Sequence, residues 1–336
     1  MPGLTEPNQV SKREDLADLY SIADMKETPF TTRLRKSKKP TNSEYDWTVD
    51  AYATAKVTGT VDGSDVADYE NHAANRARLG NYIQIFRRTA KVSRLAEHVS
   101  VVAGVPSEIG LASAKKLVEL KRDVEATFLQ NGVNGQLDTG AVPYLTASLG
   151  KWIDTTGPTI PKTVPAAFAT PTAQIITTAT ASLTEDAHVQ AMLQAVYDNT
   201  GMNGEFVLFA GSTLRRRFTD MTRTIANTNS TATKVRMFSS ENGPKVSSTT
   251  TIFQGDYGTI EIVSSNFIGA DYTTGGNTGK NLGYLCDMDK LHMRSNKTPG
   301  RESFDDTGGG PRIMIEAVCG LQVDNPLGLG AFKPAS

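Results

Sequence analysis

The chain has 336 residues, and its 35 lysines and arginines almost balance its 36 aspartates and glutamates, which argues against a protein that wraps nucleic acid through a general basic excess. Its two cysteines, Cys286 and Cys319, exclude a disulfide-dense secreted scaffold and a Cys-x-x-Cys zinc site, and a single bridge between them is the less favoured alternative to free thiols. Residues 1–11 are polar and no run of about 18 apolar residues occurs, so we expect no signal peptide and no membrane segment, and a protein of the cytoplasm or of something assembled there.

The first forty residues are predicted to form a polar, extended arm. Asp15–Met25 is predicted as a short helix with Leu16, Leu19 and Ile22 on one side, and the following Thr28-Pro29 disfavours its continuation. A basic run comes next and consists of Arg33, Arg35, Lys36, Lys38 and Lys39. A solvated arm is the favoured interpretation of this run, and contact with a polyanion or an acidic neighbour is the alternative.

Residues 44–94 are predicted to form a long β-hairpin with segregated charge. Tyr45–Val49 alternates apolar and polar residues, and Asn81–Phe86 is the predicted return strand. Glu44–Glu70 holds seven acidic residues and one lysine, whereas Arg76–Arg94 holds six basic residues and no acidic one. Opposite charges on paired strands would stabilise such a hairpin within its own chain. Because an isolated hairpin is only marginally stable in water, we favour the alternative that it lies on a neighbouring copy.

Ser107–Asn131 is the clearest predicted helix. Ser107 is a suitable N-cap and Gly132 lies just beyond the predicted end. Lys121 and Glu125 are expected to form a surface pair four residues apart. The predicted apolar stripe consists of Ile109, Leu117, Leu120, Val124 and Phe128. At 1.5 Å per residue this helix would be roughly 37 Å long, which suits a spine through the subunit.

The rest of the chain is predicted to change from loops to an α/β passage and then to strands. Residues 132–180 are rich in Gly, Pro and Thr. A helix capped by Thr184, a buried strand at Phe206–Ala210 and a helix containing Leu214, Phe218 and Met221 follow. The later predicted strands are Val235–Phe238, Thr249–Phe253, Thr259–Val263, Asn281–Met288 and Ile313–Cys319, with a hairpin turn at residues 255–258.

Motifs for catalysis or metal binding are missing. The four histidines, His72, His98, His188 and His292, have no ligand spacing, and nucleotide-binding and nucleophile-elbow motifs are absent. Gly308–Gly310 is predicted to be a flexible loop, because it neither follows a strand nor opens a helix. We therefore predict a protein that is not an enzyme and that has no cofactor and no metal.

The order of these elements resembles that of a known family. The residues that carry the resemblance are Thr28-Pro29-Phe30, Tyr45-Asp46-Trp47 with Asp50, Asn81–Ile85, Val92-Ser93 and, most clearly, Lys116–Glu125. The sequence resembles the phage capsid fold of the HK97 type and, more specifically, the SU10-type major capsid protein family. The resemblance extends over nearly the whole chain, through diffuse packing patterns with no catalytic fingerprint.

The resemblance implies an α+β subunit with an HK97-like capsid fold. Such a subunit has an N-terminal arm, an extended β-hairpin called the E-loop, a peripheral domain with a long spine helix, and an axial α/β domain. The corresponding ranges are 1–40 for the arm, 41–95 for the E-loop, 96–180 and 291–336 for the peripheral domain with its spine helix at 107–131, and 181–290 for the axial domain.

The resemblance also implies a structural role in a virion. Copies of the chain would assemble through hexamers and pentamers into an icosahedral head that encloses double-stranded DNA, after synthesis in the host cytoplasm. The expected partners are other copies of the chain, packaged DNA through non-specific contacts, and portal, scaffold or decoration proteins, with no membrane. The basic run of the arm is the best candidate for facing the genome.

The charges of the predicted hairpin would then set the register between copies, because electrostatics contributes more to specificity than to affinity. Arg87, Arg88 and Arg94 are expected to pair with acidic residues of an adjoining copy. The full set of candidate contact residues is Glu44, Asp46, Asp50, Arg76, Arg78, Arg87, Arg88 and Arg94.

Two other structural roles stay open at this point. A cellular encapsulin-like shell would have the same fold, and nucleic acid or a cargo enzyme inside the particles would discriminate the two. A phage tail or attachment protein is also compatible with the Thr- and Gly-rich C-terminal half, and it would form rings or trimers in place of closed shells.

Overall fold

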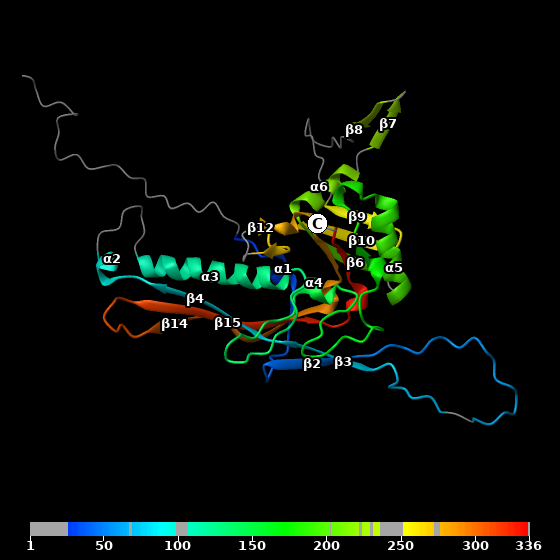
Figure 1. Cartoon of the computed structure of the whole chain (residues 1–336), viewed down its shortest axis with the longest axis horizontal. Coiled ribbons are helices and arrows are strands. Elements are labelled where there is room, and N and C mark those ends of the chain that lie inside the picture. Colours follow the sequence, from blue (N-terminus) through cyan, green and yellow to red (C-terminus); the bar gives the residue numbers. More distant parts are fainter. Residues whose placement is uncertain are drawn as a thin grey trace, which may run out of the picture.

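The computed structural model describes residues 26–66, 69–98, 107–201, 203–221, 224–228, 231–235, 251–271 and 276–334. Two β-sheets and one long helix, α3, dominate the arrangement, and a thin two-stranded hairpin projects from it (Figure 1). The predicted helix Asp15–Met25 lies outside the described residues. No helix in the described part of the chain is long and apolar enough to cross a membrane.

The first sheet has four strands in the order β1-β14-β15-β4. The strands are β1 (Arg35–Ser37), β14 (Leu291–Phe304), β15 (Arg312–Val323) and β4 (Gln84–Lys91). Strand β15 is antiparallel to both of its neighbours, β14 and β4, whereas β1 runs parallel to β14. The predicted strand Ile313–Cys319 is thus confirmed as part of β15, which continues to Val323.

Helix α3 (Glu108–Phe128) lies along one face of this sheet (Figure 1). Ser107 caps it as predicted, since its hydroxyl accepts a hydrogen bond from the Gly110 amide at 3.2 Å. Leu120, Val124 and Phe128 of the predicted stripe are buried. The expected surface pair of Lys121 and Glu125 is wrong, because Glu125 has no exposed surface.

The projecting hairpin is shorter than predicted. Strand β2 (Glu44–Val49) pairs with β3 (Ala77–Tyr82), with Tyr45 opposite Asn81. Residues 84–91 are not part of the return strand, because they form β4 and pair with β15. The buried Asn81 side chain explains the separation, since its amide donates to the Leu321 carbonyl at 2.7 Å and fixes the end of β3 on the sheet.

The second sheet has six strands in the order β5-β16-β13-β6-β10-β9. They are β5 (Ile175–Ile176), β16 (Gly330–Phe332), β13 (Gly283–Cys286), β6 (Gly204–Ala210), β10 (Gly258–Ser264) and β9 (Ile252–Gly255). The predicted turn at 255–258 joins β9 to β10. Because β5 and β16 belong to this sheet, it crosses the boundaries expected at residues 180 and 290.

Two helices pack on the six-stranded sheet. The predicted helix after Thr184 begins with a π-helical turn, Glu185–Gln190, and continues as α5 (Ala191–Thr200). The other is α6 (Ser212–Met221), which contains the predicted Leu214 and Phe218. These side chains share a core with Phe206 and Leu208 of β6 that is distinct from the core beneath α3.

The remaining elements are short. They are the helices α1 (Pro29–Arg33), α2 (Arg94–His98) and α4 (Leu149–Trp152), the strand pairs β7 (Thr224–Thr228) with β8 (Thr231–Val235) and β11 (Ala270–Asp271) with β12 (Gly276–Asn277), and 3₁₀ turns at Thr172–Gln174, Thr180–Ser182, Thr278–Asn281, Met288–Lys290 and Pro326–Gly328. Most of the predicted strand Val235–Phe238 lies outside the described residues. Cys286 and Cys319 are buried free thiols, so the alternative of a disulfide between them is wrong.

Candidate assembly surface

The loop between β2 and β3, residues 50–76, extends away from the rest of the subunit (Figure 1). Five of its large apolar side chains are exposed, and Tyr69 keeps 91% of its accessible surface. The five are Tyr52, Val57, Val61, Val66 and Tyr69. Large apolar side chains that are exposed together in one segment mark an interaction site more often than single scattered ones do. The loop therefore has the properties of a surface that another molecule covers.

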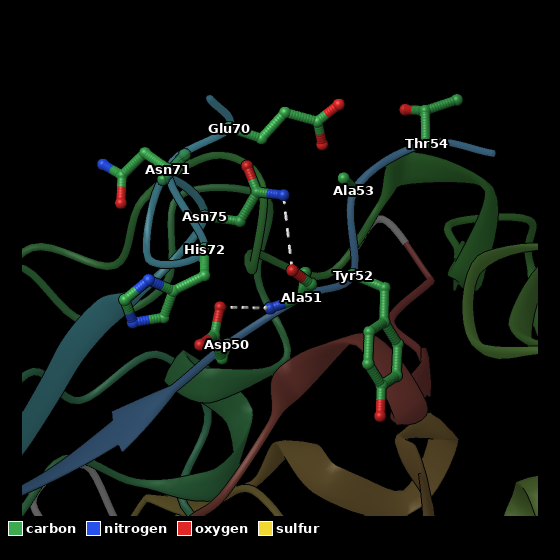
Figure 2. Close-up of a pocket in the computed structure, with 10 residues that line it drawn as sticks. Asp50, Ala51, Tyr52, Ala53, Thr54, Glu70, Asn71, His72 and Asn75 are labelled. Atoms are coloured by element: carbon green, nitrogen blue, oxygen red, sulfur yellow. Dashed lines mark hydrogen bonds between the residues drawn. The ribbon is translucent and has the colours of Figure 1, made fainter. Parts of the chain in front are cut away.

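The two arms of the loop are tied together near its base. Figure 2 shows the Asn75 amide reaching across to the Ala51 carbonyl, at 3.3 Å, beside the Asp50 carboxylate. Asp50 also accepts from the Arg76 guanidinium at 3.0 Å. Farther out, an ion pair joins Lys56 to Glu70, and this contact lowers the pKa of the Glu70 carboxyl. Between the arms lies an open hollow that Tyr52 and His72 help to line.

The acidic residues of β2 are also paired within the chain. Asp46 contacts Arg78 on β3 at 3.1 Å, which is the cross-strand pairing expected of the hairpin. Lys162 donates to Glu44 at 2.8 Å and to Asp46 at 2.5 Å. Lys162 comes from the long loop after α4, so it connects the base of the hairpin to the body of the subunit. Nothing in the local sequence around Lys162 indicates this role.

The three arginines expected to contact an adjoining copy have acidic partners in their own chain. Arg87 pairs with Glu316 at 2.7 Å and Arg88 with Asp123 at 2.5 Å. Their partners lie 229 and 35 residues away in the sequence, and so no local pattern could find them. Both arginines stand on β4 and not on the hairpin. These ion pairs lie within the subunit, and contact of the eight candidate residues with a second copy stays a prediction.

Arg94, the first residue of α2, takes part in a different arrangement. It donates to Asp306 at 2.7 Å, and the other Asp306 oxygen accepts from the amides of Gly308, Gly309 and Gly310 at 2.8, 3.0 and 3.1 Å. These hydrogen bonds, that of Gly309 first, hold the pKa of Asp306 far below its usual range. The three-glycine segment, predicted to be a flexible loop, is thus wrapped around a carboxylate.

The basic run of the arm divides into two groups. Arg33 forms two hydrogen bonds to Glu261 of β10, at 2.6 and 2.7 Å, and Arg35 contacts Asp289 at 2.6 Å. Lys36, Lys38 and Lys39 are exposed. Within the described ranges, no acidic side chain forms an ion pair with these three lysines. Only they remain available for an external polyanion.

A buried carboxylate holds the beginning of the described chain. Glu125 on α3 accepts from the amides of Phe30 and Thr31 at 2.8 and 2.7 Å. Burial raises the pKa of Glu125, and these backbone hydrogen bonds oppose the rise. The ring of Phe30 packs edge-on against Phe209 of β6, with centroids 5.1 Å apart. Helix α1 therefore lies against the spine helix on one side and the six-stranded sheet on the other.

The described residues contain no group of three or more His, Cys, Asp or Glu side chains that could hold a metal ion. The main features of the described residues are instead ion pairs within the chain and the loop 50–76 with its exposed apolar side chains. These are features of a subunit that assembles with other subunits. A family model for the SU10 major capsid protein matches residues 4–336.

The chain belongs to the SU10 major capsid protein family.

Solved structures agree with this assignment at the level of the fold. The capsid structure of cyanophage P-SCSP1u is 13% identical, with a TM-score of 0.59 over 99% of this chain and 97% of that one. The cyanophage Pam1 capsid is 12% identical, with a TM-score of 0.59 and 98% coverage of both chains. A Gordonia phage Cozz chain is 14% identical, with a TM-score of 0.59 and 99% coverage of both. No curated protein matches the chain.

The family decides between the structural roles that the sequence left open. The protein is a major capsid protein of a tailed phage, with a mixed α+β fold, and its place is the capsid of the virion. It assembles with copies of itself. A cellular compartment protein and a tail or attachment protein are not supported, and the family is not an enzyme family.

Proposed function

We propose that this capsid protein forms hexamers and pentamers that close into an icosahedral head around double-stranded DNA, and that the loop 50–76 of each subunit lies across an adjacent subunit. The observation that carries the second part is the exposure of its five large apolar side chains. In a closed shell each contact need only be weak, because every subunit makes many of them.

We assign the parts of the fold to the family's architecture as follows. Residues 1–40 form the N-terminal arm, and β2, β3 and the loop between them form the E-loop. The peripheral domain consists of α3 with the four-stranded sheet, which includes β4. The axial domain consists of the six-stranded sheet with α5 and α6, and it therefore includes β5 and β16.

Further partners follow from the charges and the family. We assign Lys36, Lys38 and Lys39 to non-specific contacts with packaged DNA, because they are exposed bases without an acidic partner in the described part of the chain. Portal, scaffold and decoration proteins are further proposed partners, and assembly takes place in the host cytoplasm.

The role of the loop is tested by replacing its two tyrosines, Tyr52→Ser with Tyr69→Ser. Both rings are exposed and contribute little to the core, so the unassembled subunit should keep its circular dichroism spectrum and its melting temperature. The yield of closed shells in electron microscopy and sedimentation should fall at least about tenfold, since aromatic anchors dominate interface energies.

The matched control is Tyr52→Phe with Tyr69→Phe, which keeps both rings and should keep assembly. Normal shell yield from the double serine variant would show that the loop does not hold neighbouring subunits together. A lowered melting temperature would instead show that the loop stabilises its own subunit.

A further inference from the structure

An apolar groove lies between the spine helix and the outer edge of the four-stranded sheet. Leu120 and Val124 of α3 form one wall, Met293 and Pro299 of β14 form the other, and Cys319 of β15 lies on the floor. Thr28, the N-cap residue of α1, also lines the groove. The volume of the groove is about 220 Å³, and most of its lining surface is apolar.

The groove is open because strand β1, which pairs with the outer edge of β14, ends before it reaches the groove's full length. Strand β1 pairs with β14 only from His292 to Arg294, and the following chain last contacts β14 where the Asn296 amide donates to the Pro40 carbonyl at 3.2 Å. Beyond Asn296, no described strand pairs with the outer edge of β14. Along the same stretch, the apolar residues Ile109 and Leu117 of α3 are only partly buried. A half-exposed helix face thus lies beside an unpaired strand edge.

We propose that residues 15–25 of the same chain occupy this groove as an amphipathic helix, with Leu16, Leu19 and Ile22 against its apolar walls. These residues lie outside the described part of the chain, and the proposal rests on the groove and on where the described chain begins. It does not depend on shell assembly.

The length of the connection favours the chain's own segment. Thr28 itself lines the groove, so the chain reaches it at one end. Only Lys26 and Glu27 separate Met25 from Thr28, and the three residue steps span at most about 11 Å. A helix over residues 15–25 would be about 16 Å long, which equals the rise of α3 between Ile109 and Leu120. The segment therefore fits along the half-exposed part of the spine helix.

The charges are complementary as well. Residues 14–25 contain four acidic side chains and no basic one. Two lysines, Lys121 and Lys297, are among the residues that line the groove, and Lys121 is exposed. Lys297 already pairs with Glu302 and Glu316, so Lys121 is the lysine whose charge complements the acidic segment. Such complementarity fixes the register of a docked helix.

The native thiol on the groove floor provides the test. In the full chain, Leu19→Asp with Ile22→Asp should displace the segment and increase the rate of Cys319 alkylation by iodoacetamide roughly tenfold, because local opening controls the reactivity of a buried group. Ala17→Asp with Ser21→Asp adds the same charge outside the stripe and should leave the rate unchanged. Cys286, which is fully buried in the other sheet, is the internal reference, and mass spectrometry reports both sites.

Equal Cys319 rates in the two variants would overturn the proposal. Measurement on unassembled protein over a range of concentrations tests the same-chain assignment. If the protection of Cys319 from alkylation does not depend on protein concentration, the segment of the same chain occupies the groove. If this protection is lost on dilution, the groove is occupied by a segment or loop of a second copy.

A change on the groove side keeps the test independent of the segment's own variants. Ser295→Trp should fill the groove and accelerate tryptic cleavage after Arg13 and Lys26. Ser303→Trp, on the same strand but beyond the groove, should not. Equal cleavage rates in these two variants would contradict docking.

Discussion

Glu125 illustrates how a single side chain connects distant parts of this subunit. It is a carboxylate without exposed surface on the spine helix, and it accepts the amides of Phe30 and Thr31 at the start of α1. Because α1 has only five residues, it could not hold its own position in water. The carboxylate therefore fixes where the N-terminal arm joins the body.

Replacement of Glu125 by alanine should destabilise the unassembled subunit by about 2 kcal/mol, because it leaves buried backbone donors without an acceptor. Urea denaturation measures this directly. Glu119→Ala is the control on the same helix, since Glu119 forms a partly exposed pair with Lys116 and accepts no backbone amide from α1, so its removal should cost about 1 kcal/mol or less. Equal losses of unfolding free energy in the two variants would show that the buried hydrogen bonds to Glu125 contribute no more than the Glu119 ion pair does.

The pH dependence of stability should also depend on Glu125. Its pKa is raised in the folded state by burial, so the folded subunit binds the proton more tightly than the unfolded chain does. This tighter proton binding stabilises the folded subunit at pH values below the pKa of Glu125 in the unfolded chain, which is near 4.5. The stabilisation is lost as the pH rises through the pKa of Glu125 in the folded subunit. Glu125→Gln, which stays neutral, should therefore gain stability relative to the native protein across this window. A constant difference in unfolding free energy over pH 4 to 8 would contradict the shift.

At the scale of elements, the spine helix depends on its cap. The Ser107 hydroxyl accepts the Gly110 amide and donates to Glu97 of α2 at 2.7 Å, so one side chain orders two helices. Ser107→Ala should lower the unfolding free energy by about 1 kcal/mol. Ser113→Ala, within the same helix, should change it by less than about 0.5 kcal/mol. Thermal or urea unfolding of both variants decides the matter, and a cap variant as stable as its control would refute the role of Ser107.

Local and non-local determinants separate clearly in this chain. The helix at 108–128, its cap and the β9–β10 turn follow from short-range signals, and the sequence predicts them well. The division between β3 and β4 cannot be predicted from short-range signals, because it depends on contacts of Asn81 with residues that are 65 and 240 positions away. The same holds for the partners of Arg87 and Arg88. In the candidate assembly surface, alternation predicted the hairpin, but only the structure reveals which charges are already neutralised.

At the scale of the whole molecule, near-neutral net charge leaves polyanion binding to local patches, and we propose the three exposed lysines of the arm as such a patch. Changing Lys36, Lys38 and Lys39 to glutamine should weaken non-specific DNA binding and reduce the slope of log K against log salt by roughly 2 to 3, at about 0.9 per lost phosphate contact. Binding titrations at several salt concentrations give this slope.

The matched control changes Lys115, Lys280 and Arg301, which are exposed bases elsewhere on the surface, to glutamine. It removes the same charge and should leave most of the slope intact. If both triple variants lose the same slope, binding depends on overall charge and not on the arm.

The position of β16 bears on how the subunit is made. This strand, residues 330–332, lies inside the six-stranded sheet, between β5 and β13. Strand β5 is made early in the chain and its neighbour β16 late, so β5 has no partner in the sheet until residues 330–332 have left the ribosome. The sheet cannot be completed before that point. A shorter nascent chain therefore cannot present a finished six-stranded sheet to another copy, and polymerisation has to wait for this late part of synthesis.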